Sequence, residues 1–319
     1  MAIEATGPAS PRERAEAAAR RMACWGGGAI GLHPAAATIA VPMFSAVDHD
    51  CWLVEAGETQ AFLKVPSPDM APFLDPAAAH GAIEAAAAIG VTPAAIAYDE
   101  TSGAIALTWL GEGWRGAYMD ELPRGPRREA LIGLKKRLHD GRPFPRHRTI
   151  FSHLQELTAL GDRLGTIWPD DHRTFVDYAD RIAAAFAASG YELRPCHGDG
   201  HSSNVLLGPN DALLLVDFDF AANNDPLYDL AAALLDIEPW DDGIEEAIEI
   251  YRGSFDRKLA NRVKLHMILD DMLWARLALI AAQSSPRRHV EFLKYGEFRL
   301  LRCRYHLRTW PVDEMLRRL

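Results

Sequence analysis

The sequence predicts an α+β fold in two lobes, a small β-rich N-terminal lobe and a larger α-helical C-terminal lobe. Short apolar runs bounded by turn residues gather before residue 110, which is typical of strands. Helical periodicity dominates from about residue 118, and its one interruption is a short hairpin near residue 210. A chain of 319 residues is long enough for two such lobes.

The N-terminal lobe is predicted over residues 37–109, after a helical extension over residues 1–36. In the extension, Ser10 can cap a helix over 10–24, with Pro11 at its first position. The predicted elements of the lobe are strands over 37–45, 50–56, 60–65, 94–98 and 104–109, and a helix over 76–89 that Gly90 ends.

A hinge over residues 110–117 is predicted to lead into the C-terminal lobe, residues 118–319, with a ligand cleft between the lobes. The predicted helices of this lobe span 127–139, 150–165, 171–189, 227–236, 243–252, 256–282 and 287–307. Asp270 and Asp271 are interpreted as a solvated helix face, and so is the basic cluster that includes Arg128 and Lys135.

The amino-acid composition limits which partners and which cellular compartment are expected. The net charge of −10 disfavours nucleic acid and anionic membranes, and it suits a cationic substrate. The four cysteines lie far apart, which favours reduced thiols in the cytoplasm. Neither a secretory signal nor a membrane span is expected. The sequence leaves the oligomeric state open.

Two polar motifs flank the predicted hairpin. Residues 197–204 read H-G-D-G-H-S-S-N, and residues 216–219 read V-D-F-D, with apolar runs between them. Because the ends of a hairpin meet, Asp199, Asn204 and Asp217 are expected at one place. A free carboxylate beside oxygen ligands for Mg²⁺ is what phosphoryl transfer from ATP requires, and the protein-kinase catalytic loop has the same Asp-to-Asn spacing.

These residues receive predicted roles. Asp199 is the candidate general base toward a substrate hydroxyl, although a lone loop Asp would more often bond backbone amides. Asn204 and Asp217 are the candidate ligands of Mg²⁺. Asp219 either binds substrate or metal or points away, since alternate strand residues face opposite sides.

Lys64 lies in an apolar strand and is the candidate contact to the phosphates of ATP, with Glu84 of the next helix as its partner. The alternative is an edge-strand lysine that faces solvent. His197 is interpreted as a support for the catalytic loop, and Asp229 as a structural residue that caps the next helix and bonds back to that loop.

Aromatic residues of the helical lobe could form a cage around a quaternary ammonium group, although aromatics at helical spacing are usually core. The candidates for substrate binding are Trp240, Trp274 and Tyr295. A metal-dependent hydrolase, with zinc or iron on His197, Asp199, His201 and Asp217, is a further hypothesis.

Residues 197–204, 216–221 and 224–231 together resemble the motifs of the aminoglycoside-phosphotransferase-like kinases, especially the choline/ethanolamine kinase and thiamine kinase branch. The resemblance implies a protein-kinase-like fold with Asp199 as base, Asn204 and Asp217 as magnesium ligands and Lys64 on ATP. It also implies a small alcohol or amino-alcohol acceptor, with choline, ethanolamine, thiamine, sugars and aminoglycosides open.

The chain departs from this family at two places. Residues 44–51, which match its nucleotide-binding turn, contain no glycine and carry Asp48 and Asp50, which would repel phosphate. The family's helix glutamate aligns near His80, one turn before Glu84. The glycine-free turn keeps a second hypothesis open, a pseudokinase-like binding protein.

Overall fold

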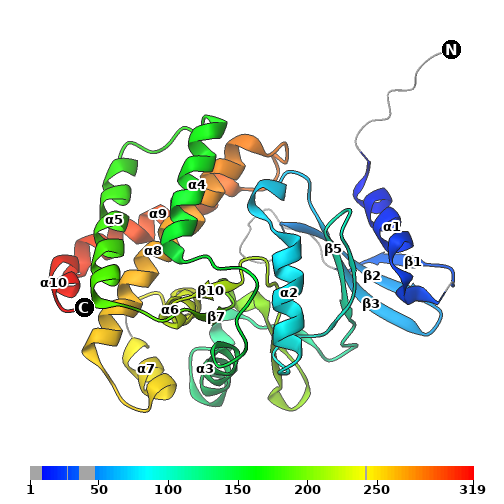
Figure 1. Ribbon diagram of the computed structural model, residues 1–319, viewed down its shortest axis with the longest axis horizontal. Coiled ribbons are helices and arrows are strands. Elements are labelled where there is room, and N and C mark those ends of the chain that lie inside the picture. The colour runs from blue at the N-terminus through cyan, green and yellow to red at the C-terminus, as the bar shows by residue number, and fades with distance from the viewer. Residues whose placement is uncertain (1–8, 27, 36–46, 241–242) are drawn as a thin grey trace.

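A five-stranded antiparallel sheet forms the N-terminal part of the molecule (Figure 1). The computed structural model describes residues 9–26, 28–35, 47–240 and 243–319. The strands, in the spatial order β1-β2-β3-β5-β4, are β1 (Gly31–Pro34), β2 (His49–Ala56), β3 (Thr59–Pro66), β5 (Ala104–Thr108) and β4 (Ala95–Asp99). Four of them match predicted strands, and the strand predicted over 37–45 lies outside the described residues.

The edge strand β1 differs from the prediction, because it lies inside the segment 1–36 that was assigned to a helical extension. It pairs with β2 from Gly31 opposite Glu55 to Pro34 opposite Trp52. Four residues that include glycine and proline carry no strand periodicity, so only the neighbouring strand makes this segment extended.

Two helices cover the two faces of the sheet (Figure 1). Helix α1 (Pro11–Arg21) begins with the predicted cap: the Ser10 hydroxyl accepts from the Glu13 amide at 3.3 Å, and the Glu13 carboxylate accepts from the Ser10 amide at 2.7 Å. Its alanines pack on one face, against residues that include Val54 and Leu63. Helix α2 (Pro76–Ala87) packs on the other face, against the strand β5.

The C-terminal part is helical, as predicted. Its helices are α3 (Gly125–His139), α4 (Ile150–Leu164), α5 (His172–Ser189), α6 (Pro226–Ile237), α7 (Ile244–Arg252), α8 (Arg257–Ser284), α9 (Phe292–Thr309) and α10 (Val312–Arg317). Its short strands are β6 (Arg115–Gly116), β7 (Arg194–Cys196), β8 (Val205–Leu207), β9 (Leu213–Leu215) and β10 (Ala222–Asn224). Helix α10 and the strands β6, β7 and β10 were not predicted, because segments this short carry little periodicity.

The long helix α8 is the centre of the helical part, packed between α4, α6 and α9. Asp270 and Asp271 of α8 are 2% and 0% exposed, so the predicted solvated face is wrong. Arg299 and Arg302 of α9 pair with them, with Arg302 Nη2 at 2.7 Å from Asp271 Oδ1. Such pairing offsets much of the cost of burying the charges.

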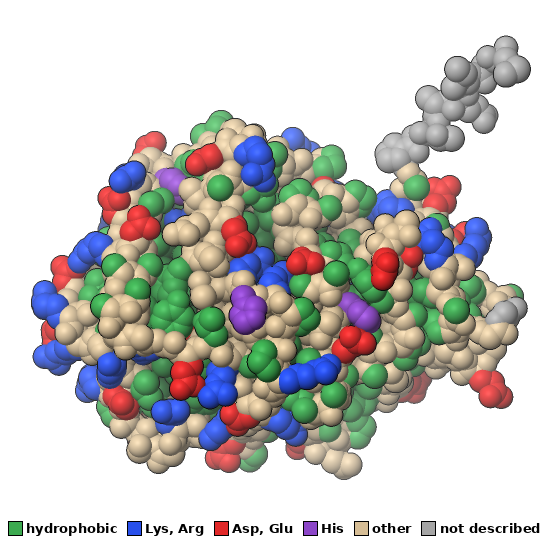
Figure 2. Space-filling view, in the orientation of Figure 1, with side chains coloured by type: hydrophobic (Ala, Val, Ile, Leu, Met, Phe, Trp, Pro, Cys, Tyr) green, Lys and Arg blue, Asp and Glu red, His purple; other side chains and the backbone are tan. Residues whose placement is uncertain are grey.

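Acidic and basic side chains are interspersed over the face of the molecule shown in Figure 2. All four cysteines are unpaired, as predicted. None of the helices among the described residues has the length and apolar composition needed to cross a bilayer.

Candidate active site

The hairpin β8–β9 brings the two polar motifs together, as predicted. Its register runs from Val205 opposite Leu215 to Leu207 opposite Leu213. At its open end the Val216 amide donates to the carbonyl of Asn204 at 2.9 Å. The loop before β8 and the loop after β9 therefore lie side by side, each with its acidic residue.

A cleft of about 550 Å³ lies above these loops, within the usual size of a small-molecule site. Four residues predicted to contact ATP, magnesium or the acceptor line it together: Lys64, Asp199, Asn204 and Asp217. Residues 107–111, which run from the end of β5 into the predicted hinge, also line it. The cleft thus contains a carboxylate pair, an amide and a lysine, which come from three separate segments: β3, the loop before β8 and the loop after β9.

Asp199 and Asn204 keep free oxygen atoms toward the cleft. Asp199 is 7% exposed, and its Oδ1 accepts from the His201 amide at 2.9 Å. Among the described residues, nothing donates to its Oδ2 or bonds the side chain of Asn204. The Asp199 carboxylate can therefore accept a proton from a ligand, and the amide oxygen of Asn204 can ligate a cation.

The catalytic-loop backbone is held from below by His197, as predicted. Its Nδ1 lies 2.7 Å from the Asp199 carbonyl oxygen and its Nε2 lies 2.8 Å from the Val216 carbonyl oxygen. Because both ring nitrogens are engaged, His197 cannot ligate a metal. Nε2 of His201 bonds the Tyr295 hydroxyl, and its Nδ1 faces Asp236. Neither imidazole of the hypothetical hydrolase site is therefore free to ligate zinc or iron.

Asp229 also supports the loop, but it does not cap helix α6. The cap is Asp225, whose Oδ1 accepts from the Leu227 amide at 2.9 Å, because the helix begins at Pro226. Asp229 instead accepts from the amides of His197 and Gly198 at 3.1 and 3.0 Å. The prediction that it bonds back to the loop is confirmed.

Buried cations complete the surroundings of Asp229. Its carboxylate receives Lys135 Nζ at 3.1 Å and His139 Nε2 at 3.0 Å. Burial alone would raise the pKa of Asp229, but Lys135 and His139 hold it far below its usual range. Lys135 is 2% exposed, so its prediction as part of a solvated face is wrong.

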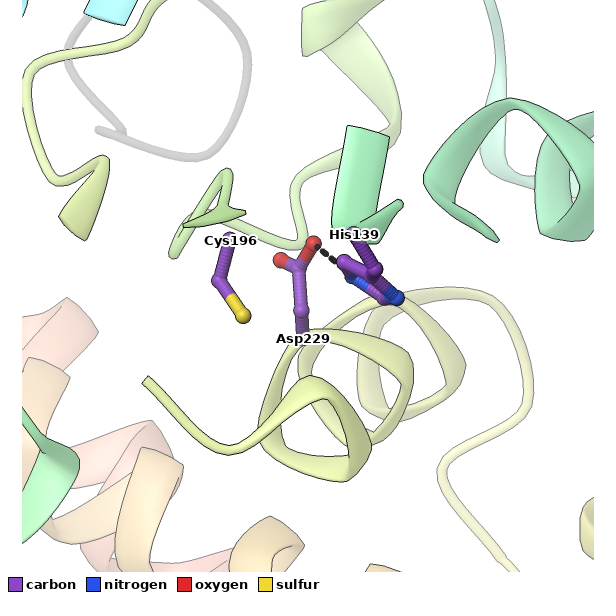
Figure 3. A group of neighbouring side chains, drawn as sticks. All are labelled: His139, Cys196 and Asp229. Carbon is purple, nitrogen blue, oxygen red and sulfur yellow. Dashed lines mark hydrogen bonds and ion pairs between the residues drawn. The ribbon is translucent and has the colours of Figure 1, made fainter. Parts of the chain in front are cut away.

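Figure 3 shows Asp229 with His139 and Cys196, three side chains close enough together to suggest a metal site. The chemistry does not fit a cation. Asp229 already pairs with Lys135. Burial raises the pKa of the Cys196 thiol, so the thiol stays protonated and does not ligate a metal ion. The group is a structural network beneath the catalytic loop.

Lys64 is buried, which contradicts the solvent-facing alternative. Its Nζ lies 2.5 Å from Asp217 Oδ1 and 3.0 Å from Asp219 Oδ2. Burial alone would lower the pKa of Lys64, but the two carboxylates outweigh it and raise that pKa. Lys64 therefore keeps its positive charge in the cleft at neutral pH.

Glu84 and Asp219 are not where the predictions need them. Glu84 lies on the exposed face of α2 and makes no ion pair with a described residue, because Asp217 and Asp219 already neutralise Lys64. Asp219 is 4% exposed and lies behind Lys64, also close to His49, outside the lining of the cleft. We therefore withdraw Glu84 as a contact to the nucleotide site and Asp219 as a contact to substrate.

The aromatic candidates divide into two groups. Trp274 and Tyr295 line the cleft, together with Phe292. Trp240 lies outside it: this residue follows α6, is 51% exposed and packs on Tyr305 with 5.0 Å between ring centroids. Trp240 is therefore withdrawn as a substrate contact.

His201 is a lining residue for which the sequence suggested no role except metal binding. Its Nε2 lies 2.9 Å from the Tyr295 hydroxyl, and its ring meets Trp274 edge-on. Burial alone would lower the pKa of His201, but the charges of Asp199 and Asp236 raise it. In the sequence, only the position of His201, two residues after Asp199, indicated that it could lie at the site.

Part of the glycine-free turn also lies in the cleft. Residues 44–46 are outside the described residues, but Asp48 lines the cleft. Burial, reinforced by Asp217 and Asp219, raises the pKa of Asp48 to about 8. This carboxyl is therefore mostly neutral at pH 7, and it repels phosphate less than the sequence suggested.

Gly200 permits the catalytic loop to touch helix α6, and its replacement tests that packing. A Cβ atom at Gly200 would lie 2.0 Å from the carbonyl oxygen of Ala232. Gly200→Ala is expected to lower the free energy of unfolding by about 1–3 kcal/mol or more. Gly133→Ala is the control, since that Cβ would meet nothing within 4 Å in the helix α3. Urea unfolding measures both, and a wild-type value for Gly200→Ala would contradict the packing described.

Comparison with curated proteins finds two versions of the protein LicA of Haemophilus influenzae. They are 24% and 25% identical to this chain over 138 and 135 residues, which is 40% of the chain in each case. The matched segment spans only 39% and 49% of the length of those relatives.

Solved structures resemble the whole chain. A choline/ethanolamine kinase family protein from Mesorhizobium loti has a TM-score of 0.77 at 21% identity, covering 97% of this chain and 99% of its own. The choline kinase LicA from Streptococcus pneumoniae has a TM-score of 0.68 at 16% identity, over 82% and 90%. A Plasmodium vivax ethanolamine kinase reaches 0.69 at 13% identity, over 90% and 84%. These likenesses confirm the predicted bilobal, protein-kinase-like fold.

The sequence itself matches a family description over residues 44–262, which is more than half of the chain. The matched range contains the hairpin, both polar motifs and Lys64. This chain belongs to the phosphotransferase enzyme family, the APH family.

Proposed function

We propose that this protein transfers the γ-phosphoryl group of ATP to the hydroxyl of a small amino alcohol of the choline or ethanolamine kind. The observation that carries the proposal is the cleft in which Lys64, Asp199, Asn204 and Asp217 meet an aromatic wall. Family membership and the named relatives, which include choline and ethanolamine kinases, support the same reaction class.

Asp199 fits the transfer step. The acceptor oxygen attacks the γ-phosphorus, the bond from that phosphorus to the bridging β,γ-oxygen breaks, and ADP leaves. Asp199 accepts the hydroxyl proton through its free Oδ2. Its bond to the His201 amide keeps the carboxylate oriented during this step.

Lys64, Asn204 and Asp217 fit the nucleotide and its metal ion. Lys64 is charged and lines the cleft, so it suits the phosphates. Asn204 and Asp217 would hold Mg²⁺, since the amide oxygen is free and the carboxylate of Asp217, which shares only its Oδ1 with Lys64, lies in the cleft wall. Bound Mg²⁺ would offset the charge that the phosphates carry.

The aromatic wall suits a cationic head group. Trp274, Phe292 and Tyr295 bring aromatic rings into the wall of the cleft that Asp199 also lines. A quaternary ammonium group gains about 0.5–2 kcal/mol from such faces. A polyhydroxylated sugar would need more polar partners than these side chains provide.

The wall yields a testable prediction. Trp274→Leu is expected to raise KM for choline about 2–30-fold, because the π face is lost, with KM for ATP nearly unchanged. Trp240→Leu, an exposed tryptophan outside the cleft, serves as the control and is expected to leave both constants unchanged. Equal effects of the two substitutions would contradict the assignment.

A panel of acceptors tests the proposal directly. Coupled ADP release is measured with choline, ethanolamine, thiamine, sugars and aminoglycosides, in the presence of Mg²⁺ and ATP. The proposal expects turnover with choline or ethanolamine. Turnover only with a sugar or an aminoglycoside would overturn the acceptor class, and tight ATP binding without turnover would favour the pseudokinase-like alternative.

A further inference from the structure

Asp69, Ser285 and Arg287 join the two lobes beside the cleft, and we call these three residues the latch. Asp69 belongs to the segment between β3 and α2, whereas Ser285 and Arg287 belong to the segment between α8 and α9; Figure 1 shows the two segments side by side. Asp69 Oδ2 accepts from the Ser285 hydroxyl at 2.6 Å and from Arg287 Nε at 2.8 Å. The side chains of the ion pair are only 12% and 19% exposed, so solvent screens it less than a surface pair.

The latch also bonds the described part of the glycine-free turn. Arg287 Nη1 donates to the Val47 carbonyl oxygen at 2.8 Å. The Ser67 amide donates to the Asp48 carbonyl oxygen at 2.8 Å, which ties the turn to the segment that carries Asp69. One guanidinium thus connects the α8–α9 segment to two separate segments of the N-terminal lobe. A turn without glycine has little backbone freedom, and these bonds hold it in one place.

The residues next to the latch line the cleft. Val47 and Met70 of the N-terminal lobe line it together with Leu277 and Phe292 of the helical lobe. All four are buried in one hydrophobic cluster, although they come from both lobes. The guanidinium of Arg287 lies over the Phe292 ring, 5.8 Å from its centroid, close enough for a cation–π contact. The latch therefore joins the lobes at the aromatic wall of the cleft.

We propose that Arg287 is a positioning residue for the acceptor. Its pair with Asp69 holds the N-terminal lobe against the aromatic wall, so that the acceptor pocket is formed before the acceptor binds. The proposal rests on the proposed function, which assigns this wall to the acceptor. A preformed pocket binds its ligand without the cost of drawing two lobes together. Where the lobes are free to separate, the apparent affinity falls with the fraction of molecules in which the pocket is formed.

Steady-state kinetics tests the positioning role. Arg287→Met is expected to raise KM for the acceptor, choline or ethanolamine, about 5–50-fold at saturating MgATP. The Kd for MgATP is expected to stay within about threefold of wild type, since no described bond joins Lys64, Asn204 or Asp217 to the latch. Arg288→Met is the matched control. Arg288 is an exposed neighbour whose described bond stays within the helical lobe, and both constants are expected to keep their wild-type values.

A double-mutant cycle separates the link between the lobes from general damage to either segment. Asp69→Ala is expected to raise the same KM. The double variant Asp69→Ala/Arg287→Met is expected to raise it no further than the larger single effect, because both substitutions remove one link. Arg287→Lys can still pair with Asp69, so it is expected to recover part of the loss. Fully additive effects of the two single substitutions would overturn the proposal.

Hydrogen exchange, followed by mass spectrometry, provides a measurement that needs no substrate. In Arg287→Met, peptides from residues 67–74 are expected to exchange faster than in the wild-type protein, whereas peptides from α4 keep the wild-type rate. Unchanged exchange over 67–74, or equal acceptor KM values in Arg287→Met and Arg288→Met, would overturn the proposal. A wild-type protein without turnover would overturn the proposed function and the positioning role with it, and hydrogen exchange would still decide whether the latch joins the lobes.

Discussion

Replacement of Asp199 by asparagine is expected to lower kcat by about 10²–10⁴-fold. The amide keeps the shape of the carboxylate and can still accept from the His201 backbone amide, but it cannot take the proton of the acceptor hydroxyl. Binding of MgATP is expected to remain nearly unchanged, because Lys64, Asn204 and Asp217 are intact. Coupled ADP release and nucleotide titration measure the two effects separately.

Asp211→Asn is the matched control for this substitution. Asp211 follows the strand β8 in the same hairpin, 69% exposed, and pairs only with Arg127 among the described residues. The control is expected to retain wild-type kcat. Wild-type turnover in Asp199→Asn would show that this carboxylate is not the general base.

Replacement of Asp229 by alanine is expected to lower the free energy of unfolding by about 3–5 kcal/mol. The substitution leaves Lys135 and His139 buried without their counter-charge and releases the amides of His197 and Gly198. Urea unfolding at pH 7 measures the loss.

The same carboxylate predicts a dependence on pH. The pKa of Asp229 is lowered in the folded protein, so its stabilising contribution is complete above the unfolded pKa of about 3.9. The contribution shrinks as the pH falls below that value toward the folded pKa. The difference between wild type and Asp229→Ala is therefore expected to be constant from about pH 5 to pH 8 and smaller in acid.

Lys135→Met in the Asp229→Ala background separates charge from packing. Removing the stranded ammonium is expected to restore part of the lost stability, since an apolar group of similar length fits the site. A double variant less stable than Asp229→Ala would contradict the explanation by an unpaired buried charge.

The sequence was informative wherever a local rule decides the structure. Ser10 and Glu13 specify the start of α1 through a capping box, and the alternating strands specify most of the sheet. Strand β1 depended on a neighbour distant in sequence. The burial of Asp270 and Asp271 depended likewise on arginines almost thirty residues away, on α9.

The candidate site divides in the same way. Asp199, Asn204 and Asp217 could be grouped from sequence, because one hairpin connects their loops. The partner of Lys64 could not, since helix packing decides whether Glu84 or Asp217 reaches the ammonium. The exclusion of Trp240 and the contact of His201 with Tyr295 also depend on how α6, α8 and α9 pack.

Transfer of labelled phosphate from [γ-³²P]ATP to the acceptor tests the central claim most directly. The wild-type protein with Mg²⁺ and choline or ethanolamine is expected to yield a labelled phosphomonoester, and Asp199→Asn is expected to yield almost none. Label released only as inorganic phosphate, or equal labelling by both proteins, would contradict a phosphotransferase site built on Asp199.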